Sequence, residues 1–280
     1  MASNSHFQQL AHLITVTDIC TPFWATLESR SLVKDVWEEW SLDLWIERGL
    51  DPMEQMALVT DDNKIIGWIG FDMLDNEKSI HDCMELITPA SILSSDTSLL
   101  DSIASFETIS GPFFLILQGN QFIGWLSYKD LHKQPLRLCL FSMLINLERM
   151  LLEVALKNPK GSFQNLKENR IKKAQELYKF KNFNFTQSGD YYISKLMECT
   201  NMIDKFTIAQ HTQNVVEMVP ALKNQHLCRK AEMLRNEIAH ASIEEHSSKL
   251  LNRDSLWPFI QWAESLEEQL QNYLESTRGY

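Results

Sequence analysis

The spacing of apolar residues changes near Pro135 and divides the chain into two parts. Before this point, short apolar runs of strand length alternate with polar turns, and the clearest pair, 113–117 and 121–126, is joined by Gly119-Asn120 and preceded by an amphipathic helix over 99–106. After it, apolar residues recur at helical spacing in runs near 136–157, 164–180, 190–210, 213–246 and 255–276. The pattern predicts an α+β N-terminal part followed by an all-α helical bundle.

The N-terminal part contains an internal repeat. Ile19-Cys20-Thr21-Pro22 is echoed by Leu86-Ile87-Thr88-Pro89 at an offset of 67 residues, and Ile66-Gly67-Trp68-Ile69 by Ile123-Gly124-Trp125-Leu126 at an offset of 57. The change of offset indicates ten additional residues in the first copy, placed near 41–54. We therefore expect an N-terminal segment, 1–14, followed by copy one at about 15–80 and copy two at about 81–135.

The order of elements in each copy, strand–helix–strand–strand–helix, resembles a tandem cystathionine-β-synthase-type (CBS) pair. In copy two, the run from Gly124 to Leu131 matches that family's pattern of Gly, any residue, a hydrophobic residue, Ser or Thr, any two residues, Asp and Leu. The resemblance implies a regulatory module that binds an adenine nucleotide such as AMP, ADP or ATP. It assigns Asp130 to the ribose hydroxyls and Ser127 to a phosphate at a helix N-terminus, with Thr88 and Gly111 lining the site.

Copy one departs from this pattern. Gly70 occupies the position of the hydroxyl residue and Met73 the position of the Asp, so at most one site of this type is expected. Helix capping by Ser127 and Asp130 is the structural alternative to ligand binding in copy two.

An acidic residue interrupts the apolar face of the first helix in the second part. Glu148 falls among Phe141, Leu144, Ile145, Leu151 and Leu152 at helical spacing. A buried carboxylate is costly unless it is paired, so the sequence predicts a basic or hydrogen-bonding partner elsewhere in the bundle.

The run Arg235-Asn236-Glu237-Ile238-Ala239-His240 supplies a candidate partner. Arg followed by a polar residue, with His five positions after the Arg, resembles the motif of the HEPN superfamily, which comprises small helical bundles that include many RNases. The resemblance implies that two protomers pair so that both motifs line one cleft, and that cleavage requires no metal. Glu148 matches an acidic residue often found on the first helix of that family.

The residue types suit RNA cleavage by attack of the 2′-hydroxyl on the adjacent phosphorus. His240 can transfer a proton near neutral pH, and Arg235 can contact a phosphate through two nitrogens. We expect Asn236 to hold His240 or the phosphate in place and Glu148 to orient Arg235. The structural alternative is a buried Arg235–Glu148 pair with an exposed His240.

Charge is unevenly distributed between the two parts. The formal net charge of −11 comes from −13 over 1–135 and +2 over 136–280. Basic residues concentrate in 157–181, which is where we expect a polyanion to bind, with Lys172 and Lys173 as the RNA contacts. Five cysteines without CxxC spacing favour reduced thiols and no metal site, and no apolar run is long enough to cross a bilayer.

Together these features predict a cytoplasmic homodimer, paired through both parts, that does not bind membranes. We expect the CBS pair to control a HEPN endoribonuclease at 136–280, with no cofactor required for cleavage, in a defence, toxin or stress-response setting. The alternative is a non-catalytic ligand sensor in which the helical bundle is a dimerisation or partner-docking surface.

Overall fold

A computed structural model describes residues 6–23, 25–36, 55–109, 111, 113–157, 161, 163–181, 189–212, 214–239 and 253–277. The chain forms two compact units, which we call the repeat unit (residues 15–131) and the helical unit (residues 1–14 and 132–280). Of the N-terminal segment expected at 1–14, the described residues 6–14 are grouped with the helices. The expected insertion near 41–54 falls entirely on residues outside those described.

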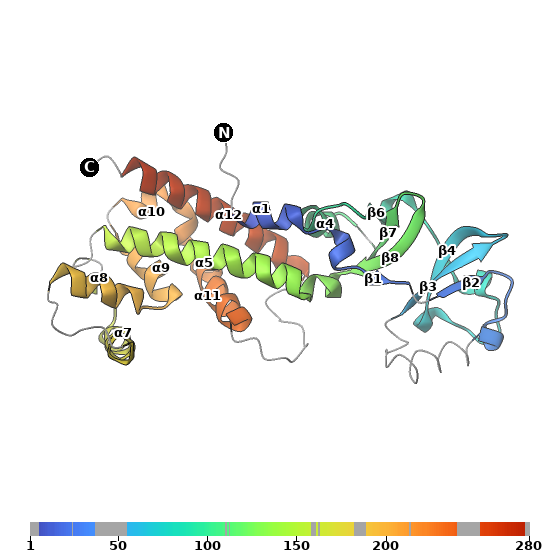
Figure 1. Cartoon of the computed structure of the whole chain (residues 1–280), viewed down its shortest axis with the longest axis horizontal. Coiled ribbons are helices and arrows are strands. Elements are labelled where there is room, and N and C mark those ends of the chain that lie inside the picture. Colours follow the sequence, from blue (N-terminus) through green and yellow to red (C-terminus); the bar gives the residue numbers. More distant parts are fainter. Residues whose placement is uncertain are drawn as a thin grey trace. The chain divides into compact units, whose positions relative to one another are not determined.

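The repeat unit contains two four-stranded sheets, with strand orders β1-β8-β7-β6 and β2-β3-β4-β5 (Figure 1). The strands are β1 (Thr21–Pro22), β2 (Ala25–Glu28), β3 (Met56–Asp61), β4 (Lys64–Gly70), β5 (Glu85–Leu86), β6 (Ile92–Ser94), β7 (Phe113–Gln118) and β8 (Gln121–Ser127). The helices are η1 (Val16–Asp18), η4 (Phe71–Met73), α3 (Ile80–Cys83), η5 (Pro89–Ser91), α4 (Leu99–Phe106) and η6 (Tyr128–His132). The two α+β copies expected from the sequence are therefore confirmed.

Both sheets contain the same three strand pairings, two within a copy and one between the copies. In each copy a parallel pair, β2 with β3 or β6 with β7, is followed by a hairpin, β3–β4 or β7–β8. The tight turn expected at Gly119-Asn120 is present, and Gly119 adopts a φ of +61° that favours glycine. Ser98 caps α4 as its sequence predicts, because its side chain accepts a hydrogen bond from the Asp101 N–H.

The first strand of each copy pairs with the last strand of the other copy. β1 pairs with β8, with Thr21 opposite Trp125, and β5 pairs with β4, with Glu85 opposite Trp68. Glycine permits both close approaches: a Cβ on Gly124 would lie 2.4 Å from the Thr21 carbonyl oxygen, and one on Gly67 would lie 2.6 Å from that of Glu85. An apolar cluster that includes Trp68, Phe113 and Trp125 draws side chains from both copies.

The helical unit is arranged around α5 (Gln134–Leu156), which packs against helices that precede and follow it in the sequence (Figure 1). The other elements are α1 (His6–Leu13), α7 (Glu168–Phe180), α8 (Asp190–Glu198), α9 (Met202–His211), α10 (Val215–Met218), η7 (Pro220–Lys223), α11 (Gln225–Ala239) and α12 (Arg253–Ser276). Leu140, Leu144, Leu147 and Leu151 are fully buried on α5, so it forms the core of this unit.

The helical class is confirmed, but two expected runs are divided. The run at 190–210 is split into α8 and α9 at Asn201, which is the N-cap residue of α9. The run at 213–246 is interrupted by Pro220, whose ring cannot continue a helix, so that α10, η7 and α11 replace one long helix. Within the described part of the chain, no helix is both long and apolar enough to cross a membrane.

Candidate functional site

Asp130 is the centre of a hydrogen-bonded cluster in copy two. It lies on η6, its residue is 5% exposed, and its Oδ2 accepts hydrogen bonds from the Ser127 N–H (2.7 Å) and the Ser127 hydroxyl (2.9 Å). Its Oδ1 accepts a third from the Thr21 hydroxyl at 2.7 Å. Ser127 and Asp130 therefore cap η6, as in the structural alternative, and Asp130 also ties η6 to the exchanged strand β1.

Thr21 is the residue that sequence reasoning missed. The resemblance assigns Thr88 to the copy-two site, and this assignment stays a prediction. In the structure Thr88 follows β5 by two residues, caps η5 and hydrogen-bonds Ser91. Because the first strands are exchanged between copies, Thr21 of copy one is the threonine that reaches Asp130. The echo marks both threonines, but it does not say which copy each one serves.

Support for a ligand site is weaker at Gly111 of copy two, and at Gly70 and Met73 of copy one, than at Asp130. A Cβ on Gly111 would meet only ordinary contacts, the nearest at 3.7 Å to Ile109, so the backbone there does not require glycine. In copy one the Gly70 N–H approaches the Met73 sulfur at 3.3 Å, which puts a thioether where copy two has a carboxylate. The expectation that copy one lacks a site of the same chemistry stays a prediction.

Other hydroxyl–carboxylate caps in the repeat unit show what is particular to Asp130. Thr15 with Asp18, and Ser79 with Asp82, make the same backbone and hydroxyl contacts at the same spacing. Both of those pairs are exposed, whereas Asp130 is buried and bonded to a second strand. A hydroxyl that enters this cluster would find a carboxylate acceptor and two hydroxyls that can rotate to meet it.

Three charged side chains from three helices meet in the helical unit. Glu148 on α5 accepts a hydrogen bond at Oε1 from Lys205 Nζ of α9 (2.9 Å), and its Oε2 lies 3.4 Å from Arg235 Nε of α11. The side chains are 16%, 3% and 31% exposed, respectively. The predicted basic partner of Glu148 is therefore present twice, once as the expected Arg235 and once as Lys205.

The sequence also contains a feature that indicates a buried position for Lys205. It falls at helical spacing with Met202 and Ala209 and beside Phe206, all of which are buried. A lysine on such a face requires a partner for the same reason that Glu148 does. Because Glu148 and Lys205 each interrupt an apolar helix face, pairing these two opposite charges would have predicted their contact.

Two residues of the motif, Arg235 and Asn236, are described, and they are hydrogen-bonded to each other. Arg235 Nη1 donates to Asn236 Oδ1 at 3.0 Å, and the buried Arg235 Nε makes no hydrogen bond within the described residues. His240 lies outside the described residues. Asn236 thus contacts Arg235; its expected contact with His240 or a phosphate stays a prediction.

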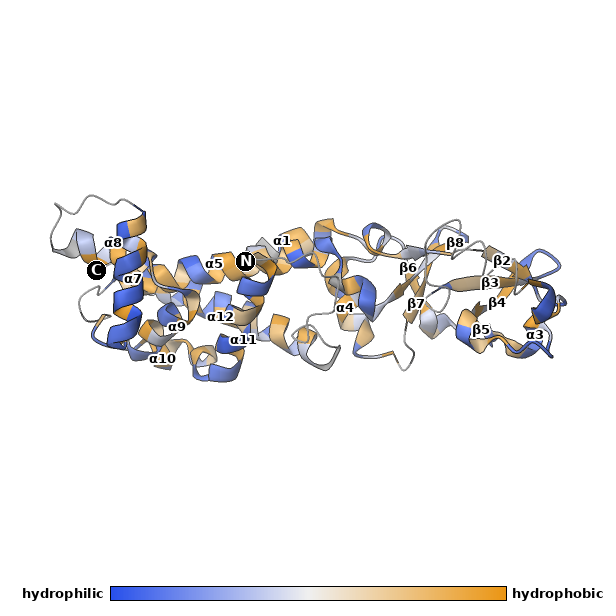
Figure 2. Ribbon diagram, turned by 90° about the horizontal axis from the view of Figure 1, so that it is seen from below, coloured by the Kyte–Doolittle hydropathy of each residue, from blue (hydrophilic) through white to orange (hydrophobic). Residues whose placement is uncertain are grey.

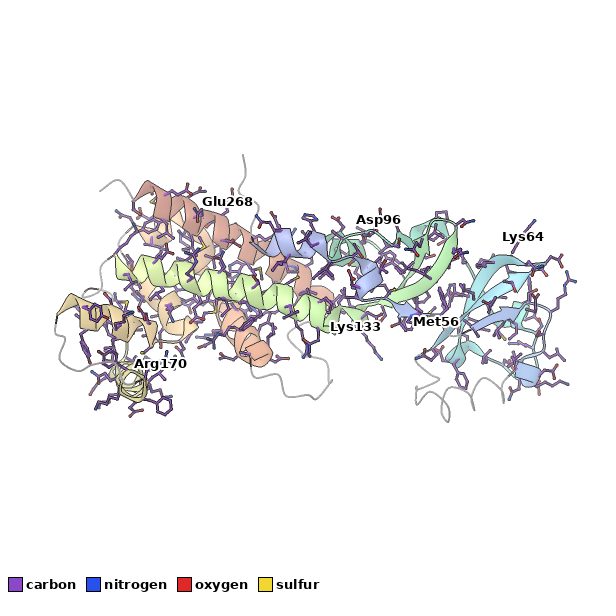
Figure 3. All side chains as sticks on the ribbon, viewed as in Figure 1. Met56, Lys64, Asp96, Lys133, Arg170 and Glu268 are labelled. Atoms are coloured by element: carbon purple, nitrogen blue, oxygen red, sulfur yellow. The ribbon has the colours of Figure 1, made fainter. Side chains whose placement is uncertain are left out.

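A second group of charges surrounds this pair. Arg170 of α7, labelled in Figure 3, forms an ion pair with Asp204 of α9 (2.7 Å) and donates to Asn201. Burial raises the pKa of the nearby Glu232 carboxyl, and the charge of Asp204 adds to the rise, although the Ile203 N–H, Arg170 and Arg235 oppose it. The region between α7 and α11 therefore contains two cations, Arg170 and Arg235, and two neighbouring carboxylates, Asp204 and Glu232.

The expected RNA contacts are exposed to solvent. Lys172 and Lys173 lie on α7, which Figure 2 colours as largely hydrophilic, and Lys172 pairs with Glu168 at 2.8 Å in an exposed contact. Such pairs are weak, so both lysines are accessible to an anion. The described residues contain no group of three or more His, Cys, Asp or Glu arranged to hold a metal ion.

No protein-family model and no curated protein matches the sequence. Among solved structures, the chain is similar to the CBS domain of the bacterial CNNM/CorC family Mg²⁺ transporter in complex with ATP (14% identity, TM-score 0.33, 45% of this chain and 89% of that one). It is similar to CBSX2 in complex with AMP (20% identity, TM-score 0.33, 45% and 98%). It is also similar to a CBS-domain protein from Thermoplasma acidophilum (18% identity, TM-score 0.32, 42% and 67%).

Proposed function

We propose that the repeat unit binds one adenine nucleotide per chain and thereby controls RNA cleavage by the helical unit. The observation that carries the sensor is the contact of Asp130 with both Ser127 and Thr21. The carboxylate accepts hydrogen bonds from the ribose hydroxyls, and Ser127 donates to a phosphate. A ligand that competes for these groups changes the contact between η6 and β1.

Nucleotide binding is tested by titration calorimetry with AMP and with ATP. We expect one site per chain and at least a tenfold loss of affinity in Asp130→Asn, because the amide keeps the shape but loses the charge that strengthens these hydrogen bonds. The matched control is Asp82→Asn, which alters an exposed cap of the same type. Absence of binding, or an unchanged affinity of folded Asp130→Asn, would contradict the sensor.

Support for the nuclease comes from the exposure of Arg235, whose side chain is 31% exposed although Glu148 and Asn236 lie against it. Its guanidinium binds the scissile phosphate and stabilises the charge that develops when the 2′-oxygen attacks phosphorus. His240 accepts the 2′-hydroxyl proton or delivers one to the departing 5′-oxygen, in a cleft formed by two protomers. The products are a 2′,3′-cyclic phosphate and a 5′-hydroxyl end.

Cleavage is tested on mixed cellular RNA in EDTA, with and without AMP or ATP. We expect the wild-type protein to cut, His240→Ala and Arg235→Ala to lose the activity by at least a hundredfold, and nucleotide to change the rate. Arg229→Ala is the matched control, because Arg229 is an exposed arginine on the same helix. Full activity in Arg235→Ala would exclude the proposed site.

A non-catalytic docking function is the second candidate. It is favoured by the fact that Arg235 already has Glu148 and Asn236 as partners, as a structural residue would. If no variant and no condition yields cleavage, this alternative replaces the nuclease.

A further inference from the structure

Lys205 is a buried cation whose role goes beyond filling the core of the bundle. Its side chain is 3% exposed, and Nζ donates to Glu148 Oε1 at 2.9 Å and to the Thr200 carbonyl oxygen. It lies on the first turns of α9, between residues that are fully buried. Its ammonium group is therefore held against one oxygen of Glu148.

The two cations do not hold Glu148 equally. The Lys205 contact has the length of an ordinary charge-assisted hydrogen bond, whereas Arg235 Nε approaches the other oxygen only to 3.4 Å and makes no hydrogen bond there. An arginine next to an unshared carboxylate forms two parallel N–H···O bonds through its fork. Lys205 takes one of the two lone pairs of Oε1 and fixes the orientation of the carboxylate.

We propose that Lys205 is a positioning residue for Arg235. By holding Oε1, it keeps the Glu148 carboxylate in an orientation in which Arg235 Nε makes no hydrogen bond to Oε2, and so keeps the arginine for a phosphodiester of the substrate. This inference rests on the proposed RNA cleavage. Without Lys205, Glu148 competes with the substrate phosphate for the same guanidinium.

The test uses binding of a single-stranded 2′-O-methyl RNA, which lacks the attacking hydroxyl, measured by fluorescence anisotropy in EDTA. In Lys205→Met we expect at least a tenfold loss of affinity, and in cleavage assays the loss falls on KM more than on kcat. Lys195→Met is the control, because Lys195 forms an ion pair of similar length with Glu198 (2.8 Å) on α8, although its side chain is 28% exposed.

A double-mutant cycle separates positioning from a merely structural contribution. If Lys205 acts through Arg235, Lys205→Met has no further effect in an Arg235→Ala background. Adding Glu148→Gln to Lys205→Met removes the competing charge, and we expect it to restore most of the affinity. Losses that add in the Arg235→Ala background, or absence of rescue in the folded double variant, overturn the inference.

Three further outcomes are decisive. Should Lys205→Met fail to fold, Lys205→Met/Glu148→Gln is compared with Glu148→Gln, and equal RNA affinities are expected; a weaker double variant overturns the proposal. If Lys205→Met matches wild type while Arg235→Ala is inactive, only the positioning role is wrong. If Arg235→Ala itself binds and cleaves like wild type, the nuclease is wrong.

Discussion

At the scale of single residues, Glu232 links the charged region of the helical unit to pH. Its pKa is raised above the usual value of 4.5, chiefly by burial, so the folded chain binds this proton more tightly than the unfolded chain does. The stability that protonation contributes is complete below pH 4.5 and is lost as the pH rises through the folded pKa.

Glu232→Gln is therefore expected to raise the free energy of unfolding at neutral pH, because it removes a buried charge. The gain shrinks as the pH falls towards 4.5, where the wild-type carboxyl is itself protonated in the folded chain. Urea denaturation of both proteins between pH 4 and pH 8 measures the difference. A difference that does not vary with pH would contradict this account.

The cysteines differ in burial and should differ in reactivity. Burial raises the pKa of Cys139 to about 11 and that of Cys228 to about 12, so almost no thiolate is present at neutral pH. Cys20 and Cys83 are only half-buried. In the folded protein, we expect iodoacetamide at pH 7.5 to modify Cys20 and Cys83 at least tenfold faster than Cys139 and Cys228. In urea, all five cysteines should react at similar rates. Mass spectrometry measures the extent of modification at each site.

The candidate site shows which contacts can be predicted from the sequence and which cannot. Glu148 was misplaced on an apolar face, and that anomaly alone predicted a basic partner, which the structure supplies. Thr21 gave no comparable signal, because its contact with Asp130 depends on which copy its strand joins. Local chemistry is readable from the sequence, whereas a contact 109 residues away depends on topology.

At the scale of elements, the exchanged strand β1 depends on a glycine. In Gly124→Ala the new methyl group would lie 2.4 Å from the Thr21 carbonyl oxygen, so β1 must move. We expect the free energy of unfolding to fall by about 1–3 kcal/mol and nucleotide affinity to fall with it, because Thr21 leaves Asp130. Gly111→Ala, whose methyl group has room, serves as the control in the denaturation experiment.

Helix α7 is held to the helical unit by the buried side chains of Ala174 and Tyr178 and by the ion pair of Arg170 with Asp204. Arg170→Met leaves Asp204 buried without its ion-pair partner, so we expect a loss of about 2 kcal/mol and faster amide hydrogen exchange along α7. Lys172→Ala on the same helix removes an exposed pair with Glu168 and should change stability by less than about 0.5 kcal/mol. Equal effects of the two substitutions would show that Arg170 does not anchor the helix.

The elements themselves were largely predictable, with errors of a particular kind. Strong periodicity predicted α5 and the β7–β8 hairpin, because burial on one face repeats along each of them. The division at Asn201 was missed, since an apolar stripe continues on both sides of a cap. The periodicity reports which residues are buried, not whether the backbone between them is continuous.

At the scale of the whole molecule, the two parts carry different charges. The excess negative charge belongs to 1–135, whereas Lys172 and Lys173 lie on an exposed helix of the helical unit. Lys172→Glu/Lys173→Glu should weaken RNA binding, and if both lysines contact phosphates the slope of log affinity against log salt falls by about 1.4. Anisotropy titrations at several salt concentrations measure this slope.

The control for that experiment has the same net charge. Lys64→Glu/Lys78→Glu alters two lysines of the repeat unit, far from the proposed RNA surface in the sequence. If both double variants lose affinity equally, binding follows overall charge rather than contacts on α7.

The strand exchange also has a consequence for synthesis of the chain. Thr21 leaves the ribosome about 100 residues before Trp125, its partner in the sheet, which at 5–20 residues per second is a delay of roughly 5–20 s. During that interval copy one carries a first strand with no sheet to join, and its own sheet waits for β5. The two copies therefore complete folding together rather than in succession, and a chaperone that shields unpaired strand edges would act on this protein while translation is still under way.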